Sequence, residues 1–393
     1  MNRKIVSLMV AAALLATSAL PVMADDKKDN DRADVTLTMT SGNEFFTANN
    51  DEVMVMKELS VPYFDLELYG MEDYYYNPDC YDGITDPNDI DTPKNPGTKE
   101  TAEGNVTLLH ALIYATEIYQ LQLPEEEAGQ GALFASGEMR NQLSISGGVG
   151  SIYFTGFWEG SSNLNYYLNY QYPMSSLVGM GATADQILLE DEDHISIHRI
   201  ADTTWTKYGT SFGVLEANGK QNSASVAKGE KVTLDLAYTA RAYGSPETIT
   251  EAAAGVKLYY SSQLTSAPAA WTLLGSTDSK GQYSMNTADL SAGTYYISNN
   301  SNTVLLTDAT LEASPAIFVL TIEETVRYGD VNADGKVNSN DASLVLRYAA
   351  GLVKEIDTSA ADVNGDGKVN SNDASMVLRY AAGLISKFPV ENK

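Results

Sequence analysis

Apolar and polar residues alternate from Val35, since Val35, Leu37 and Met39 are separated by threonines. This pattern predicts a strand with one buried face, because successive side chains of a strand point to opposite faces. Further strands are predicted at 64–68, 151–154, 164–172, 186–190 and 194–200, and a long loop over 70–104. Between them, apolar residues recur at helical spacing from Leu108 to Tyr119, after Asn105 as the expected N-cap and before Pro124. Residues 35–205 are therefore expected to form one α+β domain of the β-grasp kind.

Residues 206–325 show only the strand pattern. Alternation is clear over 231–238, and shorter apolar runs follow at 256–260, 271–274, 282–285, 294–298 and 316–322. Turn-forming residues separate these runs at 278–281 and 291–293. The spacing resembles an Ig-like bacterial β-sandwich, for which a spacer role is expected.

The end of the chain holds a repeat. The stretch from Asp330 reads DVNADGKVNSNDASLVLRYAAGL, and the stretch from Asp362 reads DVNGDGKVNSNDASMVLRYAAGL. The copies start 32 residues apart and differ only at Ala333/Gly365 and Leu344/Met376. Such similarity at a fixed period predicts a duplicated structural unit.

Each copy has the residue pattern of a calcium loop followed by a helix. Oxygen-bearing side chains fall at loop positions one, three, five, nine and twelve, with glycine at the sixth position for a sharp turn and a backbone carbonyl at the seventh. Calcium prefers six to eight oxygen ligands, which alternate loop residues supply by pointing inward. The predicted ligands are Asp330, Asn332, Asp334, Lys336 (carbonyl), Asn338 and Asp341, and in the second copy Asp362, Asn364, Asp366, Lys368 (carbonyl), Asn370 and Asp373.

Both predicted helices have an apolar side. In the first copy it comprises Leu344, Val345, Tyr348, Ala349 and Leu352, and in the second Met376, Val377, Tyr380, Ala381 and Leu384. These sides are expected to pack on each other as a small core. Leu346 and Arg347, like Leu378 and Arg379, fall outside that side, which indicates a surface for a partner. The alternative is one tolerated surface leucine that was copied by the duplication.

These repeats resemble a type I dockerin, the module that attaches proteins to cohesin modules of cellulosome-type scaffolds. The resemblance covers residues 326–393 and implies two calcium ions and a cohesin partner. It also implies that the cohesin contacts are Ser339, Asn340, Leu346 and Arg347, or their counterparts Ser371, Asn372, Leu378 and Arg379. Because the copies are nearly identical, either helix is expected to present the same face. Tyr328 and Phe388 flank the repeats and are expected to hold the ends together.

The start of the chain has the features of a secretory signal over residues 1–24: Arg3 and Lys4, an apolar run, and Val22-Met23-Ala24 as a cleavage site. A charged spacer over residues 25–34 is expected to follow. The net charge of −27 argues against nucleic acid or an anionic membrane as the partner. Cys80 is the only cysteine, so an internal disulfide is excluded. The chain is thus expected to be secreted and extracellular.

Three stretches of the first domain, 107–112, 156–169 and 181–197, resemble the transcobalamin-like β-grasp domain of bacterial surface proteins (the DUF4430 type). They include Gly156-Phe157-Trp158 and an Asn169 that lacks the glycine usual after it in that family. This resemblance implies a fold rather than a ligand.

Aromatic residues concentrate in this domain, and their flat rings suit the apolar faces of sugars. Possible glycan contacts are Tyr74, Tyr75, Tyr76, Tyr81 and Trp158, with packing in the sheet as the alternative. His194 and His198 lie in one predicted strand, roughly 13 Å apart and too distant to share a zinc ion. The sequence predicts a non-catalytic component of a polysaccharide-degrading complex. The alternatives are a carbohydrate-active hydrolase of unrecognised type and an adhesion or small-ligand-binding surface protein.

Overall fold

The computed structural model describes residues 31–80, 96–131, 134, 137, 142–158, 164–173, 182–199, 208–242, 248–300, 304–306, 309–311, 313–324 and 326–392. The predicted signal, residues 25–30 of the charged spacer and Tyr81 lie outside this set. Residues 32–34, predicted as part of the spacer, belong instead to the first strand, where Ala33 is buried. Among the described residues, three hydrophobic cores each lie within one of three successive regions, and a smaller cluster joins the first two regions. The three regions are called here the first β region (31–199), the second β region (208–324) and the repeat region (326–392). None of the described helices is long and apolar enough to cross a membrane.

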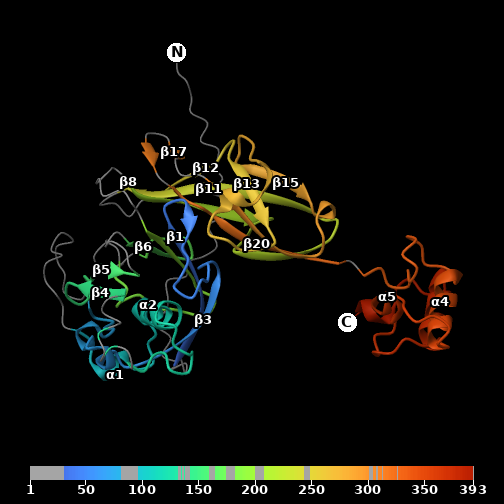
Figure 1. Cartoon of the computed structure of the whole chain (residues 1–393), viewed down its shortest axis with the longest axis horizontal. Helices are drawn as coiled ribbons and strands as arrows, with labels where there is room; N and C mark the ends of the chain where they lie inside the picture. Colours follow the sequence, from blue (N-terminus) through green and yellow to red (C-terminus); the bar gives the residue numbers. More distant parts are fainter. Residues whose placement is uncertain are drawn as a thin grey trace, which may run out of the picture.

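The first β region is built on a five-stranded sheet (Figure 1). Its central strand β1 (Arg32–Ser41) runs parallel to β7 (His194–Arg199) and antiparallel to both β2 (Glu44–Phe45) and β3 (Lys57–Pro62). Strand β6 (Leu164–Leu168) pairs with the outer side of β7, and β4 (Leu143–Ser146) forms a separate hairpin with β5 (Tyr153–Phe157). The predicted strands at 35–39, 151–154, 164–172 and 194–200 are thus present, with shifted ends.

Helix α2 (Leu108–Ala115) is buried along its whole length and shares one core with the sheet. Val35, Leu37 and Ile195 point into that core, as alternation predicts. Thr107, not Asn105, is the N-cap, and a π-helical turn (Thr116–Gln120) extends the helix at its end. Short helical turns η1 (Leu66–Tyr69), η2 (Glu72–Tyr74) and α1 (Lys99–Ala102) lie in the connection before it.

Two predicted strands are wrong. Residues 64–68 enter the 3-10 turn η1, where the Asp65 carboxylate accepts the Glu67 N–H and Gly70 ends the turn in a left-handed conformation. Leu68 is consequently 48% exposed rather than buried. Residues 186–190 form a turn with one isolated bridge, between Leu188 and Thr107. Alternation over five residues is too short to predict a strand when no neighbouring strand is available to pair with it.

The second β region consists of strands in two main sheets. One has the order β10-β20-β16-β13-β14, and the other the order β12-β11-β8-β19 with β15 on β11 and β9 on β8. Side chains of both sheets share one core, which includes Leu234 and Leu236 of β11, and Phe318 and Leu320 of β20. The bounds are β8 (Tyr208–Ala217), β9 (Lys220–Gln221), β10 (Ser223–Ala227), β11 (Lys231–Ala242), β12 (Thr248–Ala252), β13 (Lys257–Ser261), β14 (Thr272–Ser276), β15 (Gln282–Asn286), β16 (Gly293–Asn299), β17 (Val304–Leu306), β18 (Ala309–Leu311), β19 (Ala313–Ser314) and β20 (Ile317–Glu323), with 3-10 turns η4 (Pro268–Ala270) and η5 (Thr287–Asp289).

The repeat region holds two helices of equal length, α4 (Ser339–Ala349) and α6 (Ser371–Ala381). They pack on each other through Ala342 and Val345 and the equivalent Ala374 and Val377, all buried. A short helix α5 (Thr358–Ala361) precedes the second loop, and the 3-10 turn η6 (Pro389–Asn392) follows α6. The chain is therefore multidomain, with a β-rich part followed by a small helical one.

Candidate functional site

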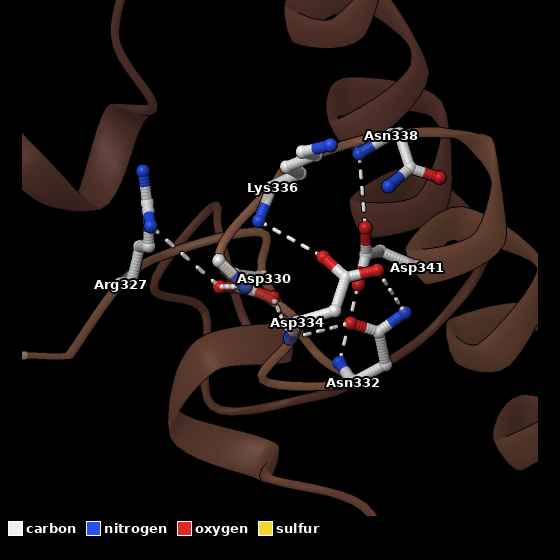
Figure 2. Close-up of polar contacts among 8 residues, drawn as sticks. Arg327, Asp330, Asn332, Asp334, Lys336, Asn338 and Asp341 are labelled. Atoms are coloured by element: carbon white, nitrogen blue, oxygen red, sulfur yellow. Dashed lines mark hydrogen bonds and ion pairs between the residues drawn. The ribbon is translucent and has the colours of Figure 1, made fainter.

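The first loop of the repeat region folds around its own carboxylates. The Asp330 carboxylate accepts the N–H groups of Asp334 (3.1 Å) and Gly335 (2.9 Å). The Asp341 carboxylate accepts those of Asn332 (3.1 Å) and Asn338 (2.9 Å), and its side chain is completely buried. Figure 2 shows that these acidic and amide groups gather on the inside of the turn. The Asn332 side-chain amide donates to the Asp334 carboxylate (3.0 Å), whereas the Asn338 side-chain oxygen accepts the Asn340 N–H (2.8 Å) as the N-cap of the following helix.

The second loop repeats this geometry. The Asp362 carboxylate accepts N–H groups from Gly365 (2.8 Å) and Gly367 (2.8 Å), and the Asp373 carboxylate accepts the Asn370 N–H (3.0 Å). The two N-caps are conformationally the same, with φ −150° at Asn338 and φ −151° at Asn370. The duplication seen in the sequence is therefore also a duplication of structure.

The sixth position of each loop needs glycine. Gly335 and Gly367 have φ values of 84° and 79°, a left-handed backbone that residues with a Cβ adopt only under strain. Position four is also left-handed. It is occupied by Ala333 (φ 56°) in the first loop and by Gly365 (φ 68°) in the second. The first loop is thus slightly more strained than the second, by about 1 kcal/mol.

The donor set fits a hard cation. Each loop offers carboxylate, asparagine and carbonyl oxygens, which is the ligand type that calcium takes and softer metals avoid. Among the described residues no three Asp, Glu, His or Cys side chains converge as a metal centre by themselves, so the fit depends on the asparagines and carbonyls as well. The buried Asp341 and Asp373 carboxylates each accept two backbone N–H groups, which favour a negative charge at the start of each helix. The roles of the Lys336 and Lys368 carbonyls stay predictions.

Arg327 is a contact that the repeat pattern could not reveal. Its guanidinium lies 4.0 Å from the Asp330 carboxylate, and its equivalent in the second copy is Ser359. Arg327 precedes the repeat, and the equivalent position of the second copy has no charge. Aligning the two copies therefore does not reveal this contact. The first loop therefore carries one more positive charge than the second.

The outer faces of α4 and α6 carry the predicted partner residues. Leu346 is 45% exposed and Leu378 is 44% exposed, and Arg347 and Arg379 are exposed beside them. Residues at the start of each helix are exposed too: Ser339, Asn340, Ser371 and Asn372. The predicted partner residues therefore lie at the surface in both copies.

Part of the predicted helix core is wrong. Leu352 is 74% exposed and Leu384 is 71% exposed, and Ala349 and Ala381 are exposed as well. The helix stops before Leu352, because Gly351 takes a left-handed conformation and the Leu352 N–H bonds back to the Arg347 carbonyl (2.8 Å). A helical wheel therefore no longer describes the direction of this side chain.

The ends of the repeat region meet around Phe388. Its buried ring stacks on Tyr380, with centroids 4.7 Å apart, and a Cβ added to Gly329 would lie 2.7 Å from its Cζ atom. The Val390 N–H also reaches the Val363 carbonyl (3.2 Å). These contacts agree with the expectation that residues flanking the repeats hold the two ends together.

The predicted glycan contacts do not form one surface. Trp158 is completely buried, stacked on Phe157 at 5.2 Å, and its Nε1–H donates to the Thr116 hydroxyl at 2.7 Å. Tyr75 is buried as well and donates its hydroxyl to Asp65. Among the described candidates, Tyr74 and Tyr76 are half-buried, while Tyr81 lies outside the described residues. The prediction is therefore wrong for Trp158, whose ring packs in the core instead of facing a ligand.

The family model that matches this chain lies in the repeat region. The type I dockerin domain model matches residues 328–381. Endoglucanase B of Acetivibrio thermocellus is 58% identical over 36 residues, which are 9% of this chain and only 6% of that relative. The third ScaC cohesin with the ScaB dockerin of Acetivibrio cellulolyticus is a similar solved structure, with 42% identity, 18% of this chain and 100% of that chain covered, and a TM-score of 0.17. A type I cohesin–dockerin complex of Clostridium thermocellum has 39% identity, covers 16% of this chain and 94% of that one, and has a TM-score of 0.15. Residues 328–381, with their twin loops and exposed helix faces, are therefore a type I dockerin domain.

Proposed function

We propose that the dockerin domain attaches this chain to a cohesin module on the scaffold of an extracellular, cellulosome-type complex that degrades polysaccharides. The observation that carries the proposal is the repeated outer face, where Leu346-Arg347 and Leu378-Arg379 stand exposed on two equivalent helices. Arginine is enriched at the centres of protein interfaces, and the neighbouring exposed leucine adds apolar area that a partner can bury. A tolerated surface leucine remains the alternative that binding measurements decide.

Calcium is the cofactor that we propose for this domain, one ion in each loop. The first loop would hold it through Asp330, Asn332, Asp334 and Asp341, and the second through the equivalent residues. Bound calcium neutralises carboxylates that otherwise repel one another, and it fixes the loop from which each helix starts. The residues of the helix faces are then presented in a constant arrangement.

Two equivalent faces lead to a specific prediction for cohesin binding. Replacing Leu346 and Arg347 by alanine should raise the Kd only about twofold, because the face of α6 still binds. Replacing Leu378 and Arg379 should do the same, whereas the fourfold variant should lose at least about a hundredfold in affinity. Calorimetric titration of the full chain with a panel of type I cohesins in calcium would measure this.

The matched control is Lys354→Ala, an exposed charge beyond the end of α4. If either pair alone abolished binding, the equivalence of the faces would be wrong while docking would stand. If the unmodified chain bound no cohesin of the panel, docking itself would be refuted.

We also propose that the β-rich part comprises a β-grasp domain of the DUF4430 type (35–205) and an Ig-like sandwich (206–325), following a signal (1–24) and a spacer (25–34). One helix over one face of a mixed sheet supports the first assignment. Two sheets around a common core support the second. The dockerin domain then occupies residues 326–393.

For the β-grasp domain we propose non-catalytic polysaccharide binding, with the half-buried rings of Tyr74 and Tyr76, together with Tyr81, as the candidate contacts. The full chain should be retained on starch, cellulose or xylan without releasing sugar. Tyr74→Ala and Tyr76→Ala together should lower retention at least about tenfold, since truncation removes the aromatic faces that would cover a sugar ring. Release of sugar would favour the hydrolase, and no retention on any polymer would favour an adhesion or small-ligand module.

A further inference from the structure

The first and second β regions are in direct contact. Phe45 of β2 stacks on Trp271 of the second region, with ring centroids 6.2 Å apart and planes at 25°. Val55 and Ile317 complete this apolar cluster, and the Phe45 N–H donates to the Ser266 carbonyl at 2.9 Å. The contact surface between the two regions is called here the seam, and this cluster is its apolar part.

The seam also has a polar part on strand β7. His194, Ser196 and His198 occupy one face of the strand, whereas Ile195 and Ile197 point into the core on the other face. All three are buried, at 1%, 2% and 4% exposure. The register pairs them with Thr36, Thr38 and Thr40 of β1, so that a polar patch two strands wide lies on this side of the sheet.

Residues of the second region cover this patch. The Phe212 ring of β8 stacks on His198, with centroids 5.1 Å apart and planes at 14°, and it lies 4.4 Å from the Tyr167 ring. The Tyr170 ring lies 5.0 Å from His194, and its hydroxyl donates to the Asn222 side chain. His198 is therefore covered by a ring of the second region, and His194 by Tyr170 of its own region, whose hydroxyl reaches across the seam to Asn222.

The turn that carries Tyr170 is strained. Leu168 and Gln171 exchange backbone hydrogen bonds of 2.9 Å, so the turn has only two central residues, and both are left-handed: Asn169 at φ 51° and Tyr170 at φ 61°. Glycine is the residue that fits the second of these positions, and a bulky ring there is unfavourable. The contacts of Tyr170 across the seam offset this strain, which indicates that the seam is a built feature of the fold.

The two imidazoles are held neutral. The Nδ1 atom of His194 lies 2.9 Å from the Thr36 hydroxyl and that of His198 lies 2.9 Å from the Thr40 hydroxyl, while neither Nε2 atom has a hydrogen-bond partner in the described structure. A charged imidazolium needs an acceptor at both nitrogens. Burial lowers the pKa of His194 to about 4 and that of His198 to about 3, the latter helped by the nearby His194.

Carboxylates close to the patch are already engaged. Asp193 accepts the Asn169 side-chain amide (2.7 Å) and the Glu190 N–H (2.8 Å). Burial raises the pKa of the Tyr170 hydroxyl, and the charge of Glu216 on β8 raises it further. The Glu216 carboxylate accepts the Gln221 side-chain amide at 2.8 Å. The other described groups that face the histidines, from β1, from the β6 turn and from β8, are threonine hydroxyls and aromatic rings. Protonation inside the closed seam would therefore leave an unpaired buried charge.

We propose that the seam is a proton-sensitive contact, which holds the second β region on the polar sheet face of the first while His194 and His198 are neutral and releases it on acidification. In the released state both imidazoles reach solvent and titrate near the ordinary value of about 6.5. The closed form binds fewer protons than the released form. Closure is therefore fully favoured above a pH of about 6.5, and it weakens as the pH falls below that value. Each histidine shifts the ratio of open to closed about tenfold per pH unit, so the pair shifts it about a hundredfold.

Trp271 reports on the seam, since it is 7% exposed and stacks on Phe45. In the full chain with Trp158→Phe and Trp205→Phe, the quenching of Trp271 by acrylamide should rise between about pH 6 and 4.5. The radius of gyration should rise with it, while far-UV circular dichroism stays constant. The variant His194→Asn/His198→Asn keeps a polar atom for each threonine and cannot gain charge, so its seam should stay closed over the same range.

The third histidine supplies the control, because His110 is buried in the core of the first region and not in the seam. His110→Asn should leave the acid opening unchanged. Opening that vanished in this control, or that persisted in the double variant, would overturn the proposal. Should the double variant fail to fold, nuclear magnetic resonance titration of the unmodified chain decides: a histidine of the seam that gains its proton without any change in Trp271 quenching refutes it.

Discussion

Removing calcium is expected to unfold the dockerin domain while the two β regions stay folded. Each loop carries three aspartates within twelve residues, and Asp341 and Asp373 are fully buried. Without a cation their mutual repulsion and desolvation oppose folding, and the small core around Val345 and Val377 is too limited to compensate. The only cysteine of the chain, Cys80, lies outside this domain, so no internal disulfide compensates either.

Limited proteolysis and scanning calorimetry of the full chain would measure this effect. In calcium, two or more unfolding transitions are expected, and a chelator should abolish the one that belongs to the C-terminal domain. Asp341→Ala should reduce the calcium stoichiometry from two to one, and Asp289→Ala, at an exposed site of the second β region, should leave it unchanged. Equal protection of the C-terminal domain in calcium and in chelator would show that the metal has no part in its folding.

The repeat region was the most predictable part of the chain because its features are local. Asn338 caps the helix that begins at the next residue, and Gly335 turns the loop whose ligands lie within a few positions of it. Nearest neighbours in the sequence therefore determine both. Leu352 was misplaced for the opposite reason: a periodic pattern does not show where a helix ends, and Gly351 ends this one early.

The β-rich part was predicted less completely because its strands depend on distant partners. Strand β1 pairs with β7, which lies more than 150 residues further along the chain. The residues of neither strand indicate which strand is its partner. Alternation identified both strands but also suggested strands at 64–68 and 186–190. Residues 66–69 form a 3-10 turn instead, and Leu188 makes only an isolated bridge with Thr107. Burial of Trp158 likewise results from its packing against Phe157 and its hydrogen bond to Thr116, which no spacing rule reveals.

Glu117 is a further residue whose role only the structure reveals. It lies in the π-helical turn after α2 and is completely buried. Its carboxylate accepts the Tyr69 hydroxyl at 2.9 Å and the Gly129 N–H at 2.6 Å, and the Tyr69 oxygen in turn accepts the Gly131 N–H at 3.1 Å. Burial raises the pKa of this carboxyl. One acidic side chain thus connects the helix end to η1 and to the loop that follows it.

Glu117→Ala is therefore expected to destabilise the first β region by about 3–5 kcal/mol, because it leaves two buried donors without an acceptor and opens a cavity. Glu117→Gln keeps one acceptor for Gly129 and should cost less, about 1–2 kcal/mol. Glu126→Ala, at an exposed site of the following loop, is the matched control and should lie within about 0.5 kcal/mol of the unmodified chain. Chemical denaturation followed by circular dichroism would measure all three. If the alanine and glutamine variants were equally stable, the hydrogen bonds of Glu117 would not be the reason for its burial, and the π-helical turn would need another explanation.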